Sequence, residues 1–160
     1  MIDWTKTDNF EANEWPGNVL GSMDYYLFHE CIFPLREATG VPMTPSPLKE
    51  GHIRAVGGSR HSLDHGDGPR LSDASDLFIA SDKNKVATVL SHARQIHAIG
   101  GFGLYFDTKP SVMIHVDARP VVKRVNGMQI RWLRVDDNYI YEHKDASLYY
   151  AELANQLEKL

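Results

Sequence analysis

The sequence predicts a single α+β domain in which a small antiparallel sheet in the C-terminal half is packed by helices. The chain has 160 residues, which is the usual size of one domain and is enough to bury a core without disulfide staples. Apolar residues recur at helical spacing early and late in the chain. Strand-like segments cluster between residues 102 and 143.

The first 40 residues contain a polar arm and one helix. Residues 1–21 are mostly polar and predict a loosely structured N-terminal arm. Residues 22–39 carry apolar side chains three and four positions apart, which predicts a helix that begins at Ser22 and stops at Gly40. We expect Pro34 to kink or divide this helix, because proline lacks the backbone N–H that a helix interior needs.

The next part of the chain is irregular until a second helix. Residues 41–58 contain three prolines and three glycines, which predict short extended pieces joined by turns. Residues 59–73 are polar and contain glycine and proline, so they predict a loop, and a short apolar piece follows at 77–80. Residues 83–99 predict a helix that ends at the glycine pair 100–101.

The hydrophobic period then changes from helical to alternating. Four strand-like segments follow, at residues 102–106, 112–117, 129–135 and 138–143. The Asn126-Gly127 pair predicts a hairpin turn between the second and third of them. Asp145 is expected to cap a final helix over 146–160.

Composition and charge exclude several classes of protein. The net charge of −4 gives no sign of the basic surface that nucleic-acid-binding proteins usually carry. It also disfavours binding to an anionic membrane surface. Cys31 is the sole cysteine, which excludes an intramolecular disulfide and a cysteine-based zinc site. The N-terminus does not resemble a secretory signal, and no apolar run approaches the roughly 18 residues that span a bilayer. We therefore expect cytoplasmic synthesis without a signal peptide, and no membrane insertion.

The strand at 112–117 carries the first candidate chemistry. Side chains alternate between the two faces of a strand, so Met113, His115 and Asp117 share the face opposite the apolar residues. His115 and Asp117 then lie about 7 Å apart along the strand. A histidine and a carboxylate at this separation can serve one site.

A second group of polar residues lies in the preceding loop. It runs from Ser59-Arg60-His61 to Asp76, which directly precedes an apolar strand. A carboxylate at the entrance to a buried strand needs a metal or a cation as partner, because an unpaired buried charge is costly. Zinc suits neutral imidazole plus carboxylate, and three protein ligands leave one position for the water that a catalytic zinc site activates.

These residues belong to a longer series of short motifs. The series is Ser59-Arg60-His61, Ala74-Ser75-Asp76-Leu77, Gly100-Gly101-Phe102-Gly103-Leu104-Tyr105, Val112-Met113-Ile114-His115-Val116-Asp117 and Arg131-Trp132. In this order it resembles the zinc D,D-carboxypeptidase and L-alanyl-D-glutamate endopeptidase family. That family includes bacterial and bacteriophage cell-wall peptidases and shares its core with the hedgehog signalling domain. The resemblance covers about half of the chain, residues 55–135.

The resemblance implies a fold, a cofactor and a substrate. It implies Zn²⁺ on His61, Asp76 and His115, on a small antiparallel sheet packed by helices. It also implies cleavage of peptide bonds next to D-amino acids in peptidoglycan, whose stem peptide is then the partner. The expected protein is a monomeric peptidoglycan peptidase of endolysin type. It would act on the cell wall after release from the cytoplasm or as part of a phage particle.

The spacing of the ligands departs from the family pattern. The family's first histidine and aspartate lie seven positions apart, whereas His61 and Asp76 are fifteen apart. The intervening segment resembles an inserted loop, and His65 within it is an alternative to His61. The serine two positions before His61 belongs to the motif and favours His61, with Ser59 fixing the loop by hydrogen bonding. Asp73 is the alternative to Asp76.

The catalytic base also departs from the pattern. Many family members place an acidic residue three positions before the last ligand, where this chain has Val112. Asp117 matches members that carry His-x-Asp instead. We expect Asp117 to act as the base, with orientation of a ligand imidazole as the alternative role.

Three further side chains are candidates for substrate contact. Arg54 and Arg60 flank the predicted metal loop and can pair with the carboxylates of a stem peptide. Tyr105 can line the groove, although aromatic residues on strands more often belong to a core.

The alternative function is a non-catalytic wall-binding or partner-binding module that keeps a structural zinc on the same fold.

Overall fold

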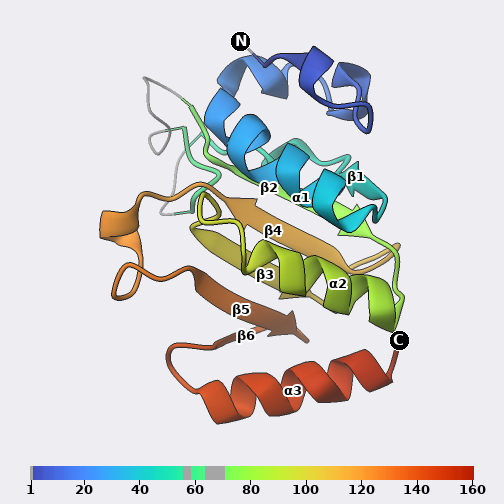
Figure 1. Cartoon of the computed structure of the whole chain (residues 1–160), viewed down its shortest axis with the longest axis vertical. Helices are drawn as coiled ribbons and strands as arrows, with labels where there is room; N and C mark the ends of the chain where they lie inside the picture. Colours follow the sequence, from blue (N-terminus) through green and yellow to red (C-terminus); the bar gives the residue numbers. More distant parts are fainter. Residues whose placement is uncertain (1, 56–58, 64–70) are drawn as a thin grey trace.

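The computed structural model describes residues 2–55, 59–63 and 71–160 and contains helices and one sheet (Figure 1). Within these residues six strands form a sheet in the order β1-β2-β4-β3-β5-β6. The strands are β1 Met43–Pro45, β2 Ala74–Ile79, β3 Gly101–Tyr105, β4 Met113–Asp117, β5 Ile130–Val135 and β6 Asn138–Tyr141. The α-helices of the described residues are α1 Phe33–Thr39, α2 Lys83–Ala93 and α3 Ala146–Glu158. The α+β prediction is confirmed.

The sheet is mixed and larger than the sequence predicts. β1 and β2 come from the N-terminal half and pair antiparallel, and β2 then pairs antiparallel with β4. β3 and β5 run parallel, while the neighbouring pairs β3–β4 and β5–β6 are antiparallel. The small antiparallel sheet predicted in the C-terminal half is therefore corrected to a six-stranded mixed sheet that also includes β1 and β2.

The chain after β4 explains the parallel pair. It crosses the end of β3, so β5 joins the far side of β3 instead of pairing with β4. Asn126 and Gly127 do form a turn with positive φ angles of 51° and 74°, but it closes only the isolated bridge between Val125 and Met128. The predicted hairpin between the strands at 112–117 and 129–135 is thus replaced by a crossover.

The N-terminal residues are more ordered than the predicted loose arm. They form three short 3-10 helices, η1 Trp4–Lys6, η2 Ala12–Glu14 and η3 Val19–Ser22. Phe10 and Trp15 are buried, and the Trp15 ring lies 5.2 Å from Phe10 and 5.1 Å from Phe28 between centroids. Isolated aromatic residues give little periodicity in the sequence but bury large areas, so they join the segment to the core.

The first long helix is divided, as Pro34 predicts. A π-helical stretch, η4 Leu27–Ile32, leads into α1, and Pro34 lies in the first turn of α1. Gly40 ends α1 in a left-handed conformation with a φ angle of 61°, as predicted.

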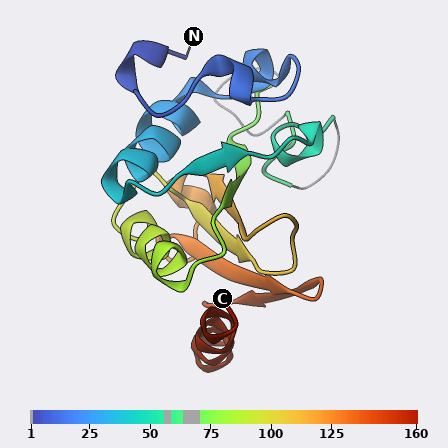
Figure 2. The same ribbon diagram turned by 90° about the vertical axis from the view of Figure 1, so that its right-hand side faces the viewer.

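The two faces of the sheet differ in character. One face carries fully buried apolar side chains, Leu77, Leu104, Ile114 and Leu133, which form the core. Figure 2 shows α1 and α2 on one side of the sheet and the short turn η5, Lys49–Gly51, on the other. Strand alternation places Asp76 and His115 on the face opposite the core residues. No helix of the described residues has the length and apolar character of a membrane span.

Candidate metal centre

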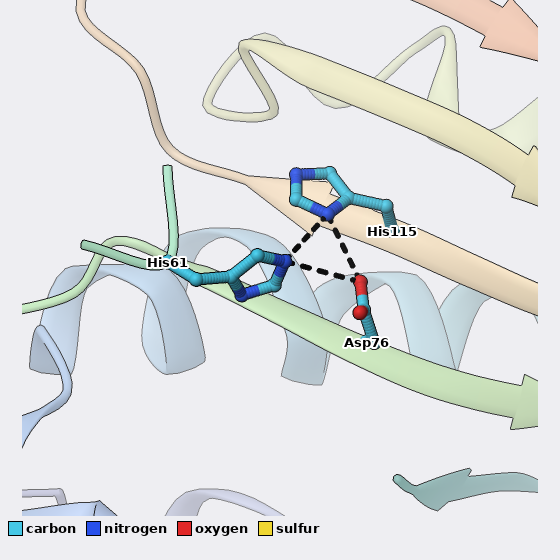
Figure 3. Close-up of side chains that lie close together, drawn as sticks. All are labelled: His61, Asp76 and His115. Carbon is cyan, nitrogen blue, oxygen red and sulfur yellow. Dashed lines mark hydrogen bonds and ion pairs between the residues drawn. The ribbon is translucent and has the colours of Figure 1, made fainter. Parts of the chain in front are cut away.

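Three side chains meet on the face of the sheet opposite the core (Figure 3). Asp76 in β2 and His115 in β4 are direct cross-strand partners, which brings their side chains together. His61 reaches them from the loop that precedes β2. The backbone N–H of His61 is 3.4 Å from Ser59 Oγ, so Ser59 fixes this loop as predicted.

The donor atoms of the three residues are closely spaced. His115 Nδ1 lies 2.9 Å from Asp76 Oδ1, and His61 Nε2 lies 3.1 Å from His115 Nδ1 and 3.4 Å from Asp76 Oδ1. Ligands at zinc distances of 2.0–2.1 Å around a tetrahedral ion lie roughly 3.3 Å apart. His61, Asp76 and His115, which we call the metal group, can therefore hold a metal ion.

Burial and charge place two of these groups in metal-binding forms. Burial opposes ionisation of Asp76, but the hydrogen bonds from His115 and His61 hold its pKa well below its ordinary value. Burial lowers the pKa of His61 and keeps its imidazole neutral. A carboxylate and a neutral imidazole are the forms that bind a metal. His61 Nδ1 is buried without a hydrogen-bond partner among the described residues.

Asp117 lies behind His115. Its Oδ2 atom accepts a hydrogen bond from His115 Nε2 at 3.1 Å, and Arg119 donates to both of its carboxylate oxygens. Burial opposes the charged form of His115, but hydrogen bonds from its two ring nitrogens to Asp117 and Asp76 raise its pKa above the ordinary value. A metal on Nδ1 would replace the proton that faces Asp76 and leave the Nε2 proton on Asp117. Asp117 is fully buried, and both of its oxygens are occupied. Asp117 thus contacts His115 on the ring nitrogen opposite to Asp76, which is the arrangement that the alternative role, orientation of the imidazole, needs.

Glycines of β3 make room for these side chains. A Cβ atom on Gly101 would lie 2.2 Å from Asp117 Oδ2, and one on Gly103 would lie 2.5 Å from the Trp132 ring. Both distances are far shorter than a real contact, so only glycine lets Asp117 and Trp132 lie flat across β3. The Gly-Gly-x-Gly pattern thus has a steric function beside the metal group.

An open cleft of about 660 Å³ leads to the metal group. Besides the buried metal group, the lining of the cleft includes basic and aromatic side chains, among them Arg54, Lys109, Arg134, Tyr105 and Tyr139. Arg54 and Tyr105 therefore line the cleft, in the place expected for substrate contact. Burial raises the pKa of Tyr105, so its hydroxyl stays protonated.

Two of the other predicted residues pair with each other. Arg60 forms an ion pair with Asp73, and the Arg60 side chain is largely buried. Arg60 also lines the cleft, so it contributes positive charge there while it anchors the metal loop. Asp73 is thus bound to Arg60, and Asp76 is the aspartate of the metal group. His65 lies outside the described residues.

Several residues at the site were not predicted from the sequence. Arg119, which donates to Asp117, lies two positions after the end of β4, so strand alternation does not identify it. His52 lies buried beneath the cleft, where its ring bonds Ser75 Oγ at 2.9 Å and the Ser46 carbonyl at 2.8 Å. Nothing in its local sequence distinguishes His52 from a surface histidine.

Comparison with known protein families, with curated proteins and with solved structures finds no match to this chain.

Proposed function

We propose that this protein is a zinc-dependent peptidoglycan peptidase. The observation that carries the proposal is the His61-Asp76-His115 group, whose three donors have zinc spacing and line an open cleft. The carboxylate behind His115 adds support, because ligand histidines in zinc sites donate their second N–H to such a group. The order of the motifs supports a hedgehog-like D,D-peptidase fold.

The proposed hydrolysis requires a bound metal and a carboxylate that transfers a proton. Bound zinc would supply a Lewis acid for the scissile carbonyl and a water with a pKa near 7. A carboxylate must then accept the proton of that water and pass it to the leaving amine. Glu50 is the residue we assign to this step. Apart from Asp76 it is the one acidic side chain that lines the cleft among the described residues.

The position of η5 supports the assignment of Glu50. A Cβ atom on the next residue, Gly51, would lie 3.4 Å from Asp76 Cβ, so the η5 backbone passes directly beside the metal group. Basic side chains that line the cleft, Arg54 and Lys109, would pair with the carboxylates of the stem peptide. The enzyme would reach its substrate after release from the cytoplasm or as part of a phage particle.

Digestion of purified peptidoglycan tests this function. We expect the zinc-loaded protein to release peptide fragments that mass spectrometry identifies. His115→Ala should lose both the zinc and the hydrolysis, and Glu50→Gln should keep the zinc and lose hydrolysis. Circular dichroism shows whether each variant is folded. Hydrolysis by folded, zinc-free His115→Ala would contradict the proposal.

A second function has one observation in its favour. Val112 occupies the position of the usual family base, and both oxygens of Asp117 are engaged by His115 and Arg119. A wall-binding module with a structural zinc would need no base. Zinc binding and wall binding without any hydrolysis, in the same digestion experiment, would favour this second function.

A further inference from the structure

A row of aromatic rings extends from the metal group across the sheet face. The Trp132 ring lies 5.1 Å from the His115 ring, and the Tyr141 ring lies 6.1 Å further along the face. The Tyr139 ring follows at 6.3 Å from Tyr141, nearly parallel to it at 21°. These residues come from adjacent strands β5 and β6 and alternate with core residues such as Leu133. We call Trp132, Tyr139 and Tyr141, with Tyr105 beside them, the aromatic row.

The aromatic row is both fixed and accessible at its outer end. Tyr139 is 50 % exposed, whereas Trp132 is 5 % exposed. Tyr139 meets the buried Tyr105 ring edge to face at 6.2 Å. Arg134 packs over Tyr105 and is held by Asp107 at 2.9 Å. An exposed aromatic surface that is held rigid before binding costs little entropy when a ligand covers it.

The chemistry of the aromatic row fits a sugar ring. A pyranose has flat apolar C–H faces and a polar edge, which match a tyrosine face surrounded by hydroxyl and guanidinium donors. Nucleotide bases also stack on aromatic rings, but that binding needs unpaired basic groups for phosphates. Arg134, the basic side chain that packs on the aromatic row itself, is bound to Asp107, and the chain carries a net charge of −4. These observations favour a neutral saccharide.

We propose that the aromatic row binds the glycan backbone of peptidoglycan. That the glycan is the one in peptidoglycan rests on the proposed function. Two ring contacts, of 5.1 and 6.1 Å, separate His115 from Tyr141, and a third of 6.3 Å leads to the exposed Tyr139. A sugar on the exposed end of the row would therefore leave the attached stem peptide free to extend towards the metal group.

The test measures binding and cleavage separately on the full-length protein. Isothermal titration with peptide-free glycan strands, and with a tetramer of N-acetylglucosamine, is expected to show binding by the wild-type protein. Tyr139→Ala should weaken it about tenfold, the cost of deleting one aromatic partner, and Tyr139→Phe should retain it. Tyr25→Ala removes a tyrosine of similar exposure (57 %) in another part of the chain and should change nothing.

Each outcome decides the proposal. Unchanged glycan binding in Tyr139→Ala, absence of glycan binding, or tighter binding of a single-stranded oligonucleotide would overturn it. Asp76→Asn should lose zinc yet bind the glycan as the wild type does. Glycan binding without any hydrolysis would therefore refute the proposed enzyme and still support the saccharide site.

Discussion

At the scale of single residues, Asp117 shows how a buried charge can serve a metal site without touching the metal. It is bound between His115 and Arg119, and these two contacts hold its pKa well below the ordinary value although burial opposes ionisation. With a metal on Nδ1 of His115, an ionised Asp117 would hold the remaining ring proton on Nε2. The role of Asp117 depends on its contacts with His115 and Arg119. Strand alternation predicts which face of the sheet Asp117 lies on, but it does not predict these contacts.

We predict that Asp117→Asn weakens zinc binding. Loss of the charge removes the support for the His115 tautomer, and changes of this kind typically lower metal affinity by about 10–100-fold. Titration with a chromophoric zinc chelator measures the affinity. Asp107→Asn is the matched control, because Asp107 also pairs with an arginine, Arg134, but makes no recorded contact with a histidine of the site. Unchanged zinc affinity with lost hydrolysis would instead make Asp117 the base.

His52 gives a second prediction at this scale, on pH. Burial lowers the pKa of His52 below its ordinary 6.5. The unfolded chain therefore binds more protons than the folded one below about pH 6.5. The stability that the neutral ring contributes is fully present above that pH and is lost as the pH falls.

We expect His52→Gln to flatten this dependence. Urea unfolding between pH 7 and pH 5, with a chelator present, should give a shallower decline in the free energy of unfolding than in the wild type. His97→Gln changes an exposed histidine and should leave the decline as it is. An equal decline in His52→Gln and the wild type would show that His52 does not titrate in this way.

At the scale of elements, β3 is the strand whose sequence is most constrained by its neighbours. We predict that Gly103→Ala destabilises the protein by about 1–3 kcal/mol, because the new methyl group overlaps the Trp132 ring. Thermal unfolding should show a midpoint lower by about 2–4 °C for each kcal/mol. Gly21→Ala is the control, since a Cβ there meets nothing within 4 Å. Equal midpoints for the two variants would contradict the steric role of Gly103.

The elements also show where local patterns succeed and fail. The spacing predicts a helix over 83–99; α2 does begin at Lys83, with Asp82 as its N-cap, but it ends at Ala93, six residues before the predicted end. Asn126-Gly127 forms a turn, as predicted, but this turn does not connect two paired strands. The strand after it, β5, pairs with β3 instead of β4. The hairpin that does form joins β5 to β6 through Asp136 and Asp137, whose φ angles are 49° and 61°. Aspartate tolerates this conformation, but a pair of aspartates is a weak hairpin signal.

At the scale of the whole molecule, a metal ion would connect three separate parts of the chain. His61 comes from a loop, Asp76 from β2 and His115 from β4. We predict that removing zinc with a chelator lowers the thermal midpoint by about 5–10 °C. This shift follows from a stabilisation of about 2.7 kcal/mol at a zinc concentration 100 times the dissociation constant.

Scanning calorimetry with and without added zinc measures this shift. His115→Ala should show the same midpoint in both conditions, because the group then lacks one of its ligands. A wild-type midpoint that does not respond to zinc would contradict the metal centre itself.

The sequence by itself determined the α+β class, the division of the first helix at Pro34 and the candidate ligands. These depend on local rules of spacing, capping and alternation. Only the tertiary structure decided that Asp76 and not Asp73 joins the histidines, and that Asp117 faces His115 and Arg119. It also placed β5 beside β3. These features depend on contacts between residues far apart in the chain, and such contacts are set by how the whole sheet packs.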